Sequence, residues 1–158
     1  MCLIIAHRNL KTIPTHKEGE PRKDRKVYKI LLFDGETYVS PFVKPFKWTL
    51  GEVITDLQEP DIRAIRMRGV TCHRIVRKGF FHAYTNLKSA SEKITKLLSD
   101  KFTQKYLNAT GKSLVIKEAI IPEGTKYYEG TNRDICAKSL KILDKDVPIL
   151  ESNSSTGS

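Results

Sequence analysis

The sequence has few cysteines. Only three occur in 158 residues, at positions 2, 72 and 136. An odd and sparse set argues against a disulfide framework and favours a reducing compartment, so a cytoplasmic location is expected. No apolar run is long enough to span a bilayer, and no basic leader precedes the short apolar patch at residues 2–6. Neither a transmembrane helix nor a secretory signal is therefore predicted.

The motifs of common enzymes and metal sites are missing as well. The chain has no Walker loop, no GxGxxG, no GxSxG and no HExxH, and no pair of carboxylates stands out for acid–base catalysis. Zinc binding by Cys72 and His73 with Cys136 and His82 lacks CxxC or HxxxH spacing, and buried cysteines with a solvent-facing histidine explain these residues more simply. An N-terminal Cys2 nucleophile lacks a downstream Gly-rich or Asn-Gly signature. No metal, cofactor or catalytic residue is assigned.

What the sequence has in excess is positive charge. It contains 28 lysines and arginines against 18 acids, for a formal net charge of +10. This balance favours polyanionic partners such as nucleic acid, nucleotides or acidic protein surfaces. Hydrophobic residues make up 39% of the chain, which fits a single domain at residues 1–150. The low-complexity residues 151–158 are predicted to form a flexible tail.

The most informative apolar segment is residues 114–121. Its apolar side chains occupy both sets of alternating positions, and only Lys117 and Glu118 interrupt it. A strand that is apolar on both faces belongs in the middle of a sheet, covered on both sides. Pro122 ends regular pairing, and residues 126–128 resume an extended chain that we interpret as an exposed aromatic loop. This segment is the predicted central strand.

Other strands are indicated around it. Residues 27–33 and 37–40 flank an Asp34-Gly35 turn and predict a hairpin. Residues 1–6, 70–76, 79–85 and 139–143 are further strand candidates. In segment 79–85, Phe81 and Ala83 alternate with residues 80, 82 and 84, so the two sets are assigned to opposite faces.

Two helices are predicted. The first follows a capping box at residues 49–52, has helical apolar spacing up to Leu57 and stops at Pro60. The second begins at a Ser89 to Glu92 capping box, or at Asn86 as an alternative cap, and its apolar stripe runs on to Phe102. The predicted fold is α+β, with a mostly antiparallel sheet of about six strands and two helices packed on it.

Two polar segments allow more than one interpretation. Residues 7–26 form either a basic arm or, more simply, a solvated loop. The loop that carries Phe42, Phe46 and Trp48 either lines a ligand groove or covers the core.

The residues best suited to bind a polyanion lie in the most basic part of the chain and in nearby aromatic segments. Arginine guanidinium groups bind phosphate in a bidentate manner, and aromatic rings stack on bases. The predicted phosphate contacts are Arg66, Arg68, Arg74, Arg77 and Lys78. The predicted stacking residues are His82, Tyr84, Tyr127 and Tyr128.

Two resemblances to known families are visible in these segments. The opening MCL, the strand VYK, then YVSPF, GFFHAYTNLKSA and VIKEAIIPEGTKYYEG together resemble a family of small uncharacterised proteins of gut bacteria and their phages. The likeness covers residues 1–143 and implies a phage-related origin, but no activity. A second likeness concerns the fold.

The GFFHAYT segment, the helix after it and the strand that ends in IPEGT are similar to the ADP-ribosyltransferase pattern. That resemblance implies an NAD-supporting strand at residues 79–85. The family's glutamate before the last strand is absent, because Ala137, Lys138 and Ser139 stand there. The family's first-strand Arg or His is also missing, because Tyr28-Lys29 stands there.

The leading hypothesis is a non-enzymatic basic protein that binds a nucleotide or a nucleic-acid polyanion. The alternatives are an ADP-ribosyltransferase-like enzyme with an atypical site, and a structural or protein-interaction module whose charge serves solubility.

Overall fold

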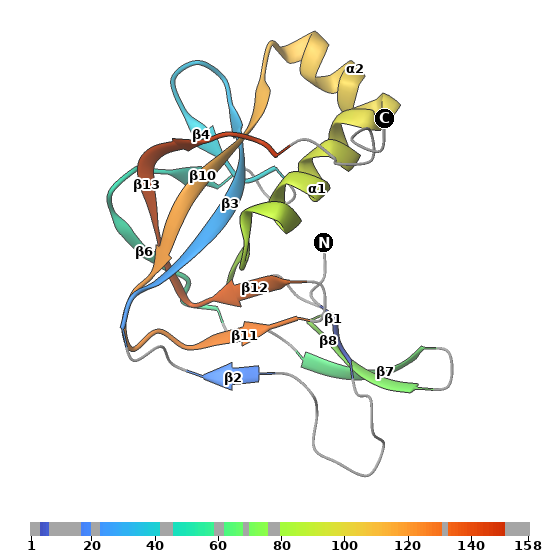
Figure 1. Ribbon diagram of the computed structural model, residues 1–158, viewed down its shortest axis with the longest axis vertical. Helices are drawn as coiled ribbons and strands as arrows, with labels where there is room; N and C mark the ends of the chain where they lie inside the picture. Colours follow the sequence, from blue (N-terminus) through green and yellow to red (C-terminus); the bar gives the residue numbers. More distant parts are fainter. Residues whose placement is uncertain are drawn as a thin grey trace.

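The computed structural model describes residues 4–6, 17–19, 23–41, 46–58, 62–67, 70–75, 80–130 and 133–150, with the backbone only at 4–6, 17–19, 62–67 and 70–75. Over these ranges the chain forms two helices, a ten-stranded antiparallel sheet and a separate three-stranded antiparallel sheet (Figure 1). The predicted α+β class is confirmed, whereas six strands was too few. The predicted flexible tail lies outside the described residues.

The elements are as follows. The large sheet holds β2 (Lys17–Gly19), β3 (Arg25–Phe33), β4 (Tyr38–Val39), β5 (Lys47–Trp48), β6 (Val53–Thr55), β9 (Phe81–Tyr84), β10 (Ser113–Ile121), β11 (Tyr127–Glu129), β12 (Asp134–Ala137) and β13 (Ser139–Val147). The small sheet holds β1 (Ile4–Ala6), β7 (Ile62–Met67) and β8 (Val70–Ile75). The helices are α1 (Leu87–Ser99) and α2 (Lys101–Thr110). The large sheet has the order β2-β11-β12-β9-β3-β10-β13-β6, and β4 pairs with both β3 and β5.

Strand β10 lies between β3 and β13, as the apolar pattern of residues 114–121 predicted. Both of its faces are covered, and β3 is covered in the same way. On one face an inner cluster forms, consisting of Val27, Leu31, Trp48, Ala83, Ala119, Ile121, Ile135, Ala137, Leu140 and Ile142. On the other face α1 packs over a helix-side cluster, consisting of Ile30, Leu32, Ala90, Ile94, Leu114 and Ile116.

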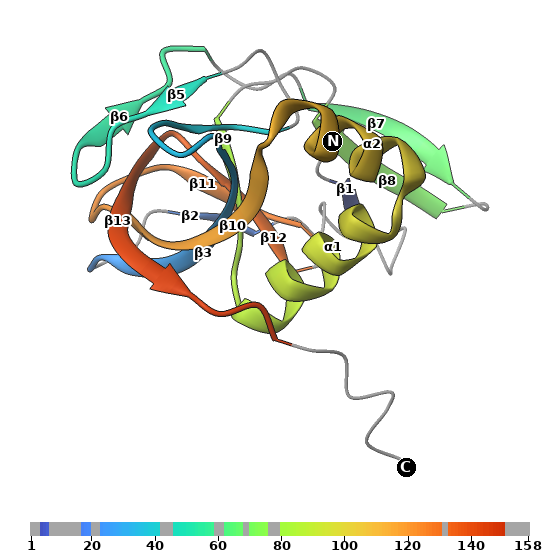
Figure 2. The same cartoon turned by 90° about the horizontal axis from the view of Figure 1, so that it is seen from above.

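The large sheet curls round the inner cluster (Figure 2). Strands β12 and β13 are separated only by Lys138, whose backbone N–H donates to the Lys126 carbonyl oxygen and whose own carbonyl oxygen accepts from Asp56 N–H. The continuous segment of β12 and β13 therefore contributes to two parts of the sheet. Strand β12 pairs with β9 and β11, and β13 pairs with β10 and β6.

The prediction of a helix after residues 49–52 is wrong. The Glu52 N–H instead donates to the Thr49 carbonyl oxygen in a tight turn, with Gly51 at φ 79°. A left-handed residue at this position is typical of a type II turn and excludes a helix start. The chain then continues as β6, a short edge strand on β13, and Ile54 packs against the inner cluster. The β-branched run at residues 53–55 suits a strand.

The second predicted helix is two helices. Asp100 ends α1 and caps α2, because its carboxylate accepts a hydrogen bond from Thr103 N–H. The start of α1 is capped by Asn86, the alternative cap, rather than by the Ser89 to Glu92 pattern. The number of helices matches the prediction, but both come from one of the two predicted segments. Phe102 is 85% exposed and does not belong to a buried stripe.

Candidate functional site

Two of the predicted phosphate-binding residues, Arg66 and Arg74, lie on the β7–β8 hairpin. Its register places Arg63 directly opposite Arg74, and Arg66 opposite Thr71. Because alternate residues of a strand belong to opposite faces, the pair Arg63 and Arg74 shares one face and Arg66 belongs to the other. Arg68, Arg77 and Lys78 lie outside the described residues. The two predicted contacts that the structure describes, Arg66 and Arg74, therefore belong to opposite faces, and Arg63, which was not among the predicted contacts, shares a face with Arg74.

The predicted stacking residues lie on the large sheet, apart from this hairpin. His82 pairs with Cys136 of β12, and Cys136 pairs with Tyr128 of β11, so these three form a row across neighbouring strands. Tyr84 pairs with Asp134, two positions along the same two strands. Its hydroxyl oxygen is buried without a hydrogen-bond partner among the described residues. Burial and the Asp134 carboxylate both raise the pKa of Tyr84.

The row does not form an activated nucleophile. Burial, together with the charge of Lys29, lowers the pKa of His82 to about 3. Burial raises the pKa of the Cys136 thiol to about 12, although a backbone hydrogen bond from Tyr128 opposes this shift. Near neutral pH both groups are uncharged, whereas a catalytic cysteine needs a lowered thiol pKa beside a protonated base. The pair is therefore a structural contact between β9 and β12.

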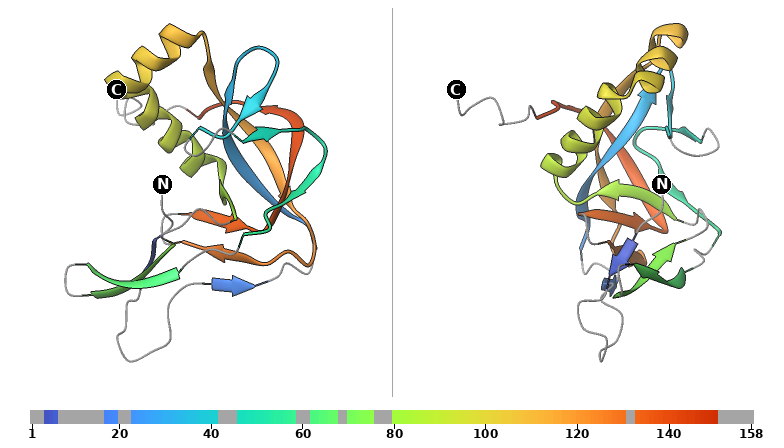
Figure 3. Two further views of the ribbon diagram at one scale, coloured as in Figure 1. Left: turned by 180° about the vertical axis from the view of Figure 1, so that it is seen from behind. Right: turned by 90° about the vertical axis from the view of Figure 1, so that its right-hand side faces the viewer.

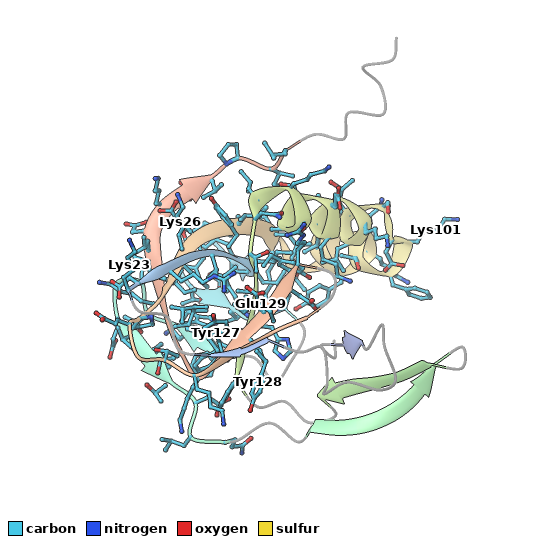
Figure 4. The ribbon with its side chains drawn as sticks, turned by 60° about the horizontal axis from the view of Figure 1, so that its bottom comes forward. Lys23, Lys26, Lys101, Tyr127, Tyr128 and Glu129 are labelled. Carbon is cyan, nitrogen blue, oxygen red and sulfur yellow. The ribbon has the colours of Figure 1, made fainter. Side chains whose placement is uncertain are left out.

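Tyr127 and Tyr128 belong to strand β11 and not to an exposed loop, which corrects that prediction. Tyr128 is only 6% exposed, stacks on Phe80 at 6.0 Å between ring centroids, and leaves little surface for a base. Tyr127 packs against the inner cluster, and the Arg25 guanidinium lies 5.3 Å from its ring centroid. Figure 4 shows both tyrosines beside Glu129, which forms an ion pair with Arg25.

The aromatic loop before residue 49 covers the core rather than lining a described groove. Trp48 is 3% exposed and its ring packs edge-on against Phe46 and Phe81, at 4.9 and 4.7 Å between centroids. Its indole N–H donates to Ser40 Oγ at 2.8 Å. Phe42 lies outside the described residues.

Two lysines on the inner face of the sheet were not anticipated. Lys29 of β3 and Lys117 of β10 lie directly opposite each other and are 7% and 1% exposed. The Lys29 ammonium donates to the His82 carbonyl oxygen and lies 5.8 Å from the Trp48 ring centroid. This bond extends the contact between β3 and β9 beyond their single backbone pair, Tyr28 with Tyr84.

The two lysines differ in their surroundings. Burial lowers the pKa of Lys29 to about 8. Burial also lowers the pKa of Lys117, but hydrogen bonds to Asp146 and Tyr38 outweigh this effect and the net shift is upward. Its ammonium lies 2.6 Å from Asp146 Oδ1. The signal for both lysines was the alternation of side chains between the two faces of β3 and β10. Positions 29 and 117 fall in the same alternating set as the apolar residues of the inner cluster.

A second surface that sequence reasoning missed lies on α2. The helix has no buried residue, and its exposed side carries Phe102 and Tyr106, which are 85% and 46% exposed. Lys101 precedes one ring and Lys105 precedes the other, and both are exposed. Figure 4 shows Lys101 projecting away from the body of the molecule. The cap residue Asp100, followed by a helical run, was the signal that could have separated α2 from α1.

Comparisons with protein-family models, curated proteins and solved structures found no match. In the described part of the chain, neither helix is long and apolar enough to cross a membrane. The same residues contain no group of three or more His, Cys, Asp or Glu side chains that could hold a metal ion.

Proposed function

We propose that the protein is a non-enzymatic binding protein for a nucleotide or nucleic-acid polyanion, with the β7–β8 hairpin as its main phosphate contact. The observation that carries this proposal is the cross-strand register of Arg63 and Arg74. Like charges directly opposite on neighbouring strands destabilise a sheet. A phosphate that binds between two such residues would relieve that repulsion.

The composition around the pair supports the same function. Residues 62–91 contain seven lysines and arginines and not a single aspartate or glutamate. No carboxylate of this segment is therefore available to neutralise the arginines. Arginine suits phosphate binding, because its planar guanidinium contacts phosphate oxygens in a bidentate manner. The proposed contacts are Arg63, Arg66, Arg68, Arg74, Arg77 and Lys78.

The position of the hairpin also supports an intermolecular role. It extends from the lower part of the molecule, at the opposite end from the helices (Figures 1 and 3). Strand β7 is an edge of the small sheet and pairs only with β8 within the described residues. A ribbon of this kind has the dimensions that fit a nucleic-acid groove or a single-stranded backbone.

The test is fluorescence anisotropy with a labelled oligonucleotide over a range of salt concentrations. The double variant Arg63→Gln/Arg74→Gln is compared with Lys23→Gln/Lys47→Gln, which removes the same charge from exposed positions outside the hairpin. We expect the hairpin variant to bind more weakly. Its slope of log K against log salt should become shallower by about 0.7 for each single-strand phosphate that the variant no longer binds.

The same variant has an expected effect on stability of opposite sign. Removing the like-charge pair should stabilise the folded protein by about 0.2–1 kcal/mol, measured by urea unfolding without oligonucleotide. If both double variants weaken binding equally, the hairpin is not the contact and only overall charge matters. If the unmodified protein binds no polyanion at low salt, the proposed function is wrong.

A further inference from the structure

The exposed side of α2 has a composition that packing among the described residues does not explain. Phe102 and Tyr106 are four positions apart in the sequence. They therefore lie one above the other on the same side of the helix, about 6 Å apart along its axis. Leu98, at the end of α1, is 38% exposed. Neighbouring exposed apolar side chains that form a patch, unlike single ones, mark interaction sites.

Positive charge surrounds these rings. Residues 93–112 contain five lysines and one acid, Asp100. That acid accepts hydrogen bonds from the Thr103 backbone N–H and hydroxyl at the start of α2. The Lys112 ammonium lies 3.2 Å from the Tyr106 hydroxyl oxygen and 5.6 Å from the ring centroid. A partner that covers the rings therefore meets cations at their edges.

We propose that this side of α2 is a stacking platform for single-stranded nucleic acid. Phe102 and Tyr106 each stack on a base, and Lys101, Lys105 and Lys112 contact the phosphates. The inference rests on the proposed function and narrows its ligand to a single strand. Bases in a duplex are already stacked on one another, so only unpaired bases offer a face to an aromatic side chain. An acidic protein surface would match the lysines but supplies no such ring faces.

The platform is separate from the hairpin. In Figures 1 and 3, α2 lies at one end of the long axis and the β7–β8 hairpin at the other. Variants of one surface therefore leave the other surface intact, and binding at the two surfaces can be measured independently.

The platform is tested with the double variant Phe102→Ala/Tyr106→Ala, an oligothymidine and a duplex of equal length. We expect single-strand affinity to fall about 5- to 150-fold for each aromatic ring removed, at every salt concentration and with an unchanged salt slope. Duplex affinity should stay the same. Lys101→Gln/Lys105→Gln should instead make the single-strand slope shallower by about 1.4. The control is Leu57→Ala, which removes an apolar side chain that is 89% exposed and lies outside α2.

Folding of each variant is checked by circular dichroism, and ultraviolet cross-linking of the unmodified protein to oligothymidine gives a second measurement. Cross-linked peptides that contain Phe102 or Tyr106 would support the platform. Unchanged single-strand affinity in the aromatic variant would overturn the platform. Equal weakening of duplex and single-strand binding would overturn it too. So would a variant that loses affinity only for an acidic peptide, measured as an additional probe. If hairpin variants weaken binding and α2 variants do not, the platform is wrong and the proposed function stands. If no oligonucleotide binds the unmodified protein, both are wrong.

Discussion

At the scale of single residues, the inner lysines are the most unusual feature of the protein. A buried ammonium loses its hydration, and this loss disfavours the charged form. An ion pair with Asp146 offsets this loss for Lys117. Lys29 instead has a main-chain carbonyl and an aromatic ring as its neighbours. The pKa of Lys29 is therefore lowered to about 8, and that of Lys117 is raised. The pKa values of these two cross-strand neighbours are thus shifted in opposite directions.

The lowered pKa of Lys29 predicts a pH-dependent stability. The unfolded chain holds this proton up to about pH 10.5, whereas the folded chain releases it from about pH 8. Between these values the unfolded state binds more protons, so the Lys29 contribution to the free energy of unfolding rises with pH, by about 3 kcal/mol in total. The penalty from the buried charge is fully present below pH 8.

The measurement is urea unfolding of the unmodified protein and of Lys29→Met at several pH values from 7.5 to 10.5. The stability of the unmodified protein relative to the variant should rise across this range. Lys47→Met, which replaces a lysine at an exposed position, is the matched control. A constant difference between the unmodified protein and Lys29→Met across this range would show that the Lys29 pKa is not lowered.

At the scale of elements, the helices show how local capping divides the chain. Asn86 Oδ1 accepts from Ser89 N–H at 2.8 Å, and Asp100 Oδ2 accepts from Thr103 N–H at 3.0 Å. Gly111, at φ 69°, ends α2 in the left-handed conformation that favours glycine. The break at Asp100 leaves α1 on the sheet and α2 with an exposed aromatic side.

The cap of α1 gives a prediction that separates the two N-terminal patterns of the sequence. Asn86→Ala should lower the free energy of unfolding by about 1 kcal/mol, because it leaves a helix N–H without its acceptor. Ser89→Ala retains the backbone N–H that Asn86 binds and should change stability by less than about 0.5 kcal/mol. Thermal or urea unfolding measures both. A larger loss of stability for Ser89→Ala would indicate that the serine is the cap.

At the scale of the whole molecule, β3 and β10 join two apolar clusters into one unit. Their inner faces contribute to the cluster around Trp48, and their outer faces contribute to the cluster under α1. If β3 and β10 separate from one cluster, the apolar residues of the other cluster are exposed to water as well. Unfolding should therefore be a single cooperative transition over both clusters.

The chain supplies a probe for each cluster. Trp48 is the single tryptophan and reports the inner cluster by fluorescence, while helical circular dichroism reports α1 together with α2. Leu140→Ala in the inner cluster and Ile94→Ala in the helix-side cluster should each lower stability by about 2–5 kcal/mol. In both variants the two probes should give the same midpoint. Separate midpoints in Ile94→Ala would show that the helix unfolds independently.

The parts of the fold that the sequence predicted correctly are those with a long, local pattern. The nearly continuous apolar run at residues 114–121 identified the central strand, and Asp34-Gly35 identified the β3–β4 turn. Residues 53–57 satisfy helical spacing and also suit a short strand. The open edge of β13 favours the strand, and that edge is set by residues far along the chain.

The candidate site was predictable only in part, for the same reason. The basic run located the hairpin, but the pairing of Arg63 with Arg74 depends on the register of β7 on β8. The sequence around Tyr127 and Tyr128 suggested an exposed binding loop. In the structure these residues form β11, which pairs with β12 on one side and β2 on the other. The ADP-ribosyltransferase resemblance and the phage-related origin stay predictions.

The register of β3 with β10 has a consequence for how the protein is made. Arg25 pairs with Ile121 and Phe33 with Ser113, so an early strand completes its sheet only with a late one. A nascent chain that emerges from the ribosome would hold β3 without its main partner until most of the sequence has been synthesised. Translation speed and chaperone access during that interval would then decide the yield of folded protein.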